Sequence, residues 1–131
     1  MQIVVVGVGA ALGGISRFLV TGTLGSVVSH WPLGTFTVNV TGSFAAGLLA
    51  VLLTEQWAVD PYWRLLVLIG FLGSFTTFST YELETLRLLE AGSLMAALAN
   101  WLGSAVAGLV GVWGGTVLGR MLYFTEEGRD G

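Results

Sequence analysis

The sequence predicts an all-α membrane protein with four transmembrane helices in one domain, residues 1–131. Two observations support this fold class: 54% of the residues are hydrophobic and only 10% are charged, and the mean hydropathy is +0.83. A soluble domain carries about 25% charged residues and could not bury so much apolar surface. Strands of a membrane barrel would alternate in hydropathy between turns. This chain has continuous apolar runs instead, so we expect helices.

Four apolar runs are long enough for a helix that crosses the hydrocarbon core, which needs about 20 residues. They cover roughly residues 2–24, 33–53, 62–90 and 94–123. Pro32 directly precedes the second run and suits the start of a helix. The connecting segments are short, so we expect one unit without a linker. An even number of spans would leave both chain ends on the same side of the membrane.

The basic residues are nearly balanced between the two sides of the predicted membrane. All five are arginines. Arg64, Arg120 and Arg129 would share the side of the chain ends, and Arg17 and Arg87 would lie toward the other. This is a weak bias under the positive-inside rule. Two interpretations stay open: a protein that inserts both ways and pairs antiparallel, or an uninformative count of few charges.

Several function classes are excluded or disfavoured by composition. The chain has no cysteine, which excludes disulfides and thiolate metal sites. It has one histidine, with no catalytic triad pattern, metal-ligand spacing or phosphate loop, so we do not expect an enzyme. The arginines form no patch, so we do not expect nucleic-acid binding. A proton-coupled transporter would need a carboxylate in mid-membrane, whereas the acidic residues lie at the ends of the runs.

Glycine recurs in the first and fourth runs. The spacing of Gly111, Gly115 and Gly119 places all three on one face of a helix. Small residues at such spacing let two helices pack closely in lipid. Four short spans cannot shield much surface from lipid, so we also expect an oligomer.

Polar residues within the apolar runs are the candidate functional residues, because polar groups at membrane depth usually face protein or water. In the second run, Thr35, Asn39 and Ser43 share one helix face. They form either interhelical hydrogen bonds or the lining of a pore. Arg17, inside the first run, is either a structural clamp or an attractor of anions at a vestibule.

The third run contains "GSFTTFSTYELE", residues 73–84. Glycine is followed by a cluster of hydroxyl residues, which are good helix N-caps, so we expect one helix to end and another to begin in mid-membrane. Such interruptions occur where they are buried in protein or line a cavity. The rings of Phe75 and Phe78 flank the hydroxyls, and the positive edge of an aromatic ring can face an anion.

Three stretches resemble signatures of the Fluc (CrcB) fluoride channels, and the resemblance covers nearly the whole chain. They are "GGISRF", "PLGTFTVNVTGSFAAG" and "GFLGSFTTFSTYELE". The resemblance implies four helices with the third broken near its centre, and an antiparallel dual-topology dimer with two pores. It also implies passive, selective export of toxic fluoride from the cytoplasm across the cell membrane, and a structural sodium ion at the dimer interface.

The resemblance further assigns roles to single residues, carried over by position in the matching motifs. Asn39 would be the pore amide, and Phe78 the first of two pore phenylalanines. Gly73 and Thr76 would offer main-chain oxygens to the sodium ion. The remaining assignments are a polar track or its surroundings for Ser79, Thr80, Thr35 and Ser104, and vestibule or helix-end positions for Arg17 and Glu84.

The chain departs from the family pattern at three positions. Tyr81 replaces the second pore phenylalanine, Glu82 stands where a small polar residue is usual, and Asn100 replaces a tyrosine. The Tyr81 hydroxyl could add an anion contact or crowd the path. Two alternatives to a homodimeric channel therefore stay open: a subunit of a heterodimeric fluoride channel that is inactive alone and, less favoured, a small proton-coupled dual-topology transporter.

Overall fold

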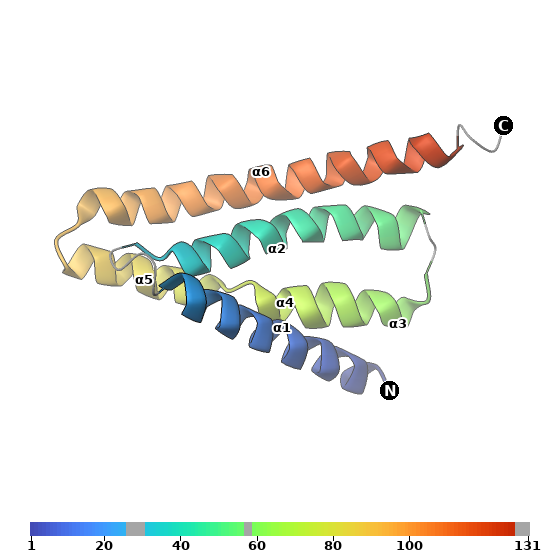
Figure 1. The fold of residues 1–131 in the computed structure, drawn as a ribbon, viewed down its shortest axis with the longest axis horizontal. Helices are drawn as coiled ribbons and strands as arrows, with labels where there is room; N and C mark the ends of the chain where they lie inside the picture. Colours follow the sequence, from blue (N-terminus) through green and yellow to red (C-terminus); the bar gives the residue numbers. More distant parts are fainter. Residues whose placement is uncertain (26–30, 57–58, 128–131) are drawn as a thin grey trace.

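The computed structural model describes residues 1–25, 31–56 and 59–127, and the regular structure of these ranges is entirely helical (Figure 1). The elements in chain order are α1 (Gln2–Gly25), α2 (Leu33–Val51), η1 (Leu52–Gln56), α3 (Pro61–Arg64), η2 (Leu65–Leu72), α4 (Gly73–Phe75), α5 (Phe78–Glu90) and α6 (Leu94–Glu127). The two η elements are π-helical and continue the α-helices that precede them.

These elements form four helical rods that are long and apolar enough to cross a membrane, which confirms the number of spans predicted. The rods are Gln2–Gly25, Leu33–Glu55, Pro61–Glu90 and Leu94–Leu122. Their bounds differ from the expected ones by one or two residues. The first rod begins and the last one ends at the same end of the molecule (Figure 1).

Local sequence sets the ends of the helices. The Asp60 carboxylate accepts a hydrogen bond from the Tyr62 N–H (2.8 Å) at the start of α3, with Pro61 at the first helical position. At the end of α5, Gly92 has φ of 74°, which favours glycine. The N–H groups of Gly92 and Ser93 donate to the last free carbonyls of α5. This turn sends the chain directly into α6.

Glycines decide how closely the rods approach one another. A Cβ atom at Gly115 of α6 would collide with the Phe44 carbonyl of α2, and one at Gly47 would collide with the Val112 carbonyl. The predicted face of Gly111, Gly115 and Gly119 lies against α2, so the packing prediction is confirmed. At these glycines the backbones of α2 and α6 are in van der Waals contact, and this close packing stabilises the helix pair.

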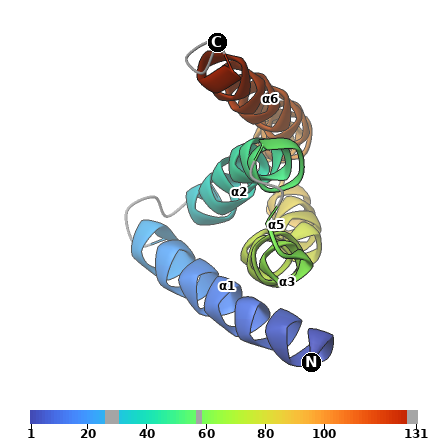
Figure 2. The same ribbon diagram turned by 90° about the vertical axis from the view of Figure 1, so that its right-hand side faces the viewer.

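Close packing at glycines also joins α1 to the third rod. A Cβ atom at Gly9 would meet the Leu66 carbonyl of η2, and one at Gly13 would meet the Phe71 carbonyl. As a result, α1 and α6 lie on opposite sides of the pair formed by α2 and the third rod (Figure 2). This arrangement is open, and only a minority of the residues of each rod are buried in the single chain.

The third rod changes geometry in its middle. Its first part ends with α4 at Phe75, and α5 begins at Phe78. Thr76 (φ −80°, ψ 155°) and Thr77 (φ −147°, ψ 121°) are extended. An extended pair inside an apolar rod leaves backbone groups without helical partners, and each of these must be satisfied within the protein.

Candidate functional site

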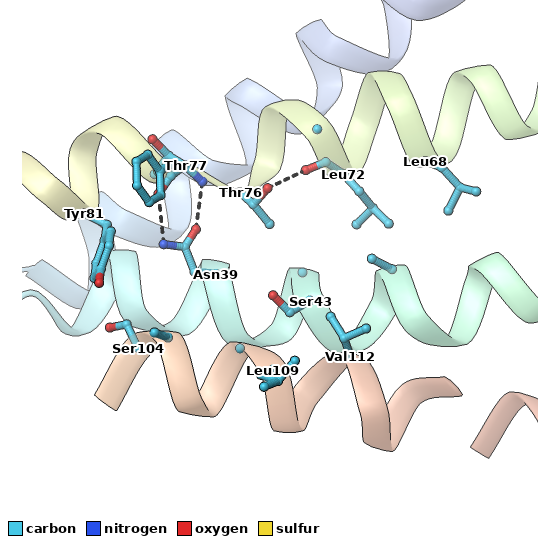
Figure 3. Close-up of a pocket in the computed structure, with 16 residues that line it drawn as sticks. Asn39, Ser43, Leu68, Leu72, Thr76, Thr77, Tyr81, Ser104, Leu109 and Val112 are labelled. Atoms are coloured by element: carbon cyan, nitrogen blue, oxygen red, sulfur yellow. Dashed lines mark hydrogen bonds between the residues drawn. The ribbon is translucent and has the colours of Figure 1, made fainter. Parts of the chain in front are cut away.

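A groove of about 590 Å³ lies between α2, the third rod and α6, beside the extended pair (Figure 3). Its lining is mostly apolar or glycine, with six uncharged polar residues: Asn39, Ser43, Thr76, Thr77, Tyr81 and Ser104. Among the residues that the structure describes, none with a charged side chain lines it. The groove therefore offers hydroxyl and amide groups in apolar surroundings, a combination typical of ligand sites.

The Asn39 side chain pairs with the backbone of Thr77. The Thr77 N–H donates to Asn39 Oδ1 (2.7 Å), and Asn39 Nδ2 donates to the Thr77 carbonyl (3.0 Å). Both bonds are visible in Figure 3. Asn39 Oδ1 thus supplies the acceptor that the Thr77 N–H loses by leaving the helix, and Asn39 Nδ2 adds a donor to the carbonyl of Thr77, the N-cap residue of α5. The Thr77 N–H needs an acceptor, which fixes the direction in which the Asn39 amide points.

Gly42 explains why the extended pair can reach α2. A Cβ atom at this position would collide with the Thr76 methyl group and would crowd the Phe75 ring. Gly42 follows Asn39 by three residues on α2, so the two lie on neighbouring parts of one helix face. The sequence motif that contains Asn39 therefore also contains the glycine that makes room for the extended pair.

The Asn39–Thr77 pairing and the Thr77 N-cap together release two main-chain oxygens from helical hydrogen bonding. In a continuous helix the Thr77 N–H would donate to the Gly73 carbonyl, but here it donates to Asn39. The Thr80 N–H would donate to the Thr76 carbonyl, but here it donates to Thr77 Oγ1, the N-cap of α5 (3.4 Å). The Thr76 carbonyl instead accepts from Arg17 Nη1 of α1 at 3.4 Å.

Two aromatic rings border the groove at the start of α5. The centroids of Phe78 and Tyr81 are 5.8 Å apart, and the ring planes are tilted by 49°. The Phe78 side chain is 75% exposed in the single chain, whereas Tyr81 is 6% exposed. The Tyr81 hydroxyl donates to the Trp101 carbonyl of α6 at 2.6 Å. Among the predicted pore aromatics, one is thus free at the surface and one is held between helices.

A buried polar cluster lies behind Tyr81, between α5 and α6. Asn100 Nδ2 donates to Thr85 Oγ1 (2.9 Å), and Thr85 Oγ1 donates to the Tyr81 carbonyl (2.9 Å). Asn100 Nδ2 also reaches the Tyr81 carbonyl at 3.5 Å, and the Ser104 hydroxyl donates to Asn100 Oδ1 at 3.4 Å. Ser104 is thus connected to the groove and to this cluster.

Thr35 and Glu84 meet outside the groove lining. Thr35 Oγ1 donates to Glu84 Oε1 at 2.7 Å across 49 residues of sequence. The other carboxylate oxygen, Oε2, is buried and has no partner among the described residues. Thr35, the first of the three polar residues on this face of α2, therefore makes an interhelical hydrogen bond, which is one of the two interpretations that the sequence left open.

The structure unites some of the predicted site residues and separates others. Asn39, Thr76, Phe78, Tyr81 and Ser104 line one groove, together with Gly73. Ser79 and Thr80 are exposed on the first turn of α5 and do not line it. Sequence reasoning gave no separate role to Thr77 or Thr85. Besides bonds within α5, Thr77 pairs with Asn39 of α2 and Thr85 with Asn100 of α6, and spacing along one helix cannot indicate such interhelical partners.

Comparison with known proteins gives one consistent family. A sequence model described as "CrcB-like protein, Camphor Resistance (CrcB)" matches residues 4–116. The "Fluoride-specific ion channel FluC" of Solibacter usitatus is 42% identical over 121 residues, which are 92% of this chain and 99% of that protein. The protein of the same name from Magnetococcus marinus is 41% identical over 123 residues, 93% of this chain and all of that protein.

A third relative extends the similarity. The "Fluoride-specific ion channel FluC" of Methylococcus capsulatus is 44% identical over 127 residues, which are 96% of this chain and 56% of that longer protein. All three names describe ion channels, in agreement with the prediction that the chain is not an enzyme. Together with the four membrane-length helices, they identify a multi-pass membrane protein.

Proposed function

The chain belongs to the CrcB-like family, and we propose that it is a passive, fluoride-selective channel that exports fluoride from the cytoplasm across the cell membrane. The observation that carries this proposal is the groove beside the extended pair, where uncharged donors and two aromatic rings converge. The names of relatives about 40% identical over most of the chain support the choice of fluoride.

The chemistry of the groove suits a small, strongly hydrated anion. Losing its water is costly, so protein donors must replace the lost hydrogen bonds. Asn39 Nδ2 carries two hydrogens and uses one for the Thr77 carbonyl, which leaves the other for an anion in the groove. The Ser104 and Thr76 hydroxyls also line the groove, and they donate their single protons within the protein, to Asn100 Oδ1 and to the Leu72 carbonyl. The Phe78 ring would present its positive edge.

The absence of fixed charge in the lining is compatible with passive conduction. A cationic side chain would bind an anion tightly and hold it, whereas conduction needs binding that is also readily released. In the proposal, Asn39 and the ring edges replace water one group at a time, and no proton transfer is involved.

We further propose that two copies pair antiparallel to complete the path, with the third rod broken at the extended pair. Phe78 is 75% exposed, and the groove is open to the surface of the single chain. Burial of the exposed Phe78 ring against a second subunit would stabilise the dimer through the hydrophobic effect. The near-even arginine distribution is compatible with insertion in both orientations.

The carbonyl oxygens of Gly73 and Thr76 fit the proposed structural sodium ion. They are the two main-chain acceptors that the Asn39 pairing and the Thr77 cap release from helical bonding, and neutral oxygens are suitable ligands for a hard cation. Arg17 Nη1 shares the Thr76 carbonyl at 3.4 Å, and a carbonyl has two lone pairs for two partners. When bound, sodium would supply positive charge at the centre of the dimer.

The experiment that tests the function is fluoride efflux from liposomes that contain this protein alone, read with a fluoride electrode, with chloride as the competing anion. Fast, selective fluoride loss without a proton gradient is the expected result. Unchanged flux after replacement of Asn39 and Phe78 in a folded dimer would contradict the pore assignment. A folded dimer that is silent alone would instead favour the heterodimeric alternative, and flux driven by a pH gradient the transporter.

A further inference from the structure

Asn100 is one of the two largest side chains that are fully buried among the described residues, at 1% exposure. It does not line the groove. A primary amide at membrane depth is costly to bury, so it persists where its hydrogen bonds are satisfied. Here its Nδ2 donates to Thr85 Oγ1 at 2.9 Å, and its Oδ1 accepts from the Ser104 hydroxyl at 3.4 Å.

Through Thr85, the Asn100 amide reaches the main chain of Tyr81. Thr85 Oγ1 donates to the Tyr81 carbonyl at 2.9 Å while it accepts from Asn100. The next residue on α6, Trp101, accepts the Tyr81 hydroxyl proton at 2.6 Å. Two consecutive residues of α6 thus hold Tyr81 at both ends, one through its carbonyl and one through its hydroxyl.

This geometry gives the Tyr81 hydroxyl a structural use. Its single proton is donated to a main-chain carbonyl of α6, so it is not available to an anion in the groove. In Figure 3 the hydroxyl oxygen lies at the end of the ring that points away from α5. What Tyr81 contributes to the groove is its ring, held 5.8 Å from the Phe78 ring.

We propose that Asn100 is a positioning residue that fixes the Tyr81 ring at the groove, by tying α6 to α5 through Thr85 and the Tyr81 main chain. The selectivity consequence rests on the proposed fluoride channel. If a ring edge discriminates between anions, its tilt must be constant, because a ring free to rotate would admit the larger chloride. The bond from the Tyr81 hydroxyl to the Trp101 carbonyl opposes that rotation, and Asn100 holds this part of α6 against α5.

The functional test compares Asn100→Leu, Thr85→Val and Thr85→Ser with the wild-type chain in liposomes. The readout is the fluoride-over-chloride flux ratio, which does not change when the amount of active protein falls. We expect Asn100→Leu and Thr85→Val to lower this ratio about tenfold, the effect of losing one oriented hydrogen bond. Thr85→Ser keeps the hydroxyl and should restore the wild-type ratio.

Trp101→Phe is the matched control. It changes a half-exposed side chain at the adjacent position of α6 and keeps the main-chain carbonyl that Tyr81 uses. We expect its flux ratio to equal that of the wild type. Reduced flux with an unchanged ratio in both Asn100→Leu and Thr85→Val would overturn the positioning role, because that pattern describes only a loss of folded protein.

A second readout separates the proposal from the proposed function. The ¹³Cζ resonance of Tyr81, assigned with Tyr81→Phe, reports the hydrogen bond of its hydroxyl and needs no conduction. We expect this resonance to shift and broaden in Asn100→Leu and to stay in place in Trp101→Phe. If the wild type conducts no fluoride but the resonance responds in this way, the positioning role of Asn100 is upheld and the proposed channel function fails. An unchanged resonance in Asn100→Leu would overturn the positioning role of Asn100.

Discussion

Asn39 and Thr77, 38 residues apart in sequence, are joined by two hydrogen bonds in opposite directions, of 2.7 Å and 3.0 Å. The Asn39 amide of α2 therefore replaces the helical acceptor that the Thr77 N–H lacks at the extended pair. In the proposed channel this relationship would connect stability and function, because the same bonds hold Thr77 in place and leave one Nδ2 hydrogen of Asn39, which lines the groove, for an anion.

Replacing Asn39 with alanine should remove both bonds and leave the Thr77 N–H without an acceptor. We expect a loss of about 2 kcal/mol or more in the free energy of unfolding and the loss of fluoride flux. Thermal unfolding in detergent and liposome efflux measure the two effects. Thr41→Ala, at an exposed hydroxyl of the same helix that donates to the Thr37 carbonyl one turn earlier, is the control. Equal stability of Asn39→Ala and wild type would contradict the structural role.

Enlarging Gly115 should separate α6 from α2. Gly115→Ala places a methyl group against the Phe44 carbonyl, and overpacking of this kind costs about 1–3 kcal/mol. Gly103→Ala is the matched control on the same helix, because a Cβ atom there would meet no atom of another helix within 4 Å among the described residues. Melting temperatures of the two variants in one detergent give the comparison. A Gly103→Ala protein that melts as low as Gly115→Ala would count against close packing as the cause.

Thr35→Val should leave the Glu84 carboxylate without the donor that now reaches Oε1 at 2.7 Å. Since Oε2 already has no partner among the described residues, we expect a destabilisation of about 1–3 kcal/mol. Thr35→Ser keeps the hydroxyl and should recover most of this loss in thermal unfolding. Equal melting of the valine and serine variants would show that the methyl group, rather than the hydrogen bond, matters at this position.

Removing sodium should weaken the proposed dimer. If the Gly73 and Thr76 carbonyls hold the ion, purification and reconstitution in N-methylglucamine salts should leave the released oxygens facing one another without a cation. We expect a lower melting temperature and a larger monomer fraction at constant ionic strength, both restored when sodium is returned. Identical melting and oligomeric state in the two salts would argue against the site.

The polar residues show how far sequence reasoning reached. Spacing along α2 correctly placed Thr35, Asn39 and Ser43 on one face, because helix periodicity is a local property. It left open whether they bond to other helices or line a pore, and the structure divides them. Thr35 bonds to Glu84, Asn39 bonds to Thr77 while lining the groove, and Ser43 lines the groove.

Tyr81 shows the opposite case. From sequence, its hydroxyl was either an anion contact or an obstruction, and no pattern within the third run could choose. The acceptor that it takes, the Trp101 carbonyl, lies on the next helix. The turn at Gly92 brings α6 back along α5, and only that return gives the hydroxyl a partner away from the groove.

The sequence by itself determined the number of spans, the glycine face of the fourth run and the family, because hydropathy, residue spacing and motif identity are properties of contiguous segments. The tertiary structure decided which acceptor each buried donor takes: Thr77 for Asn39, Glu84 for Thr35, and Trp101 for Tyr81. The physical reason is that a hydrogen bond needs two groups within about 3 Å. For groups on different helices, that distance is set by where the glycines let the helices cross.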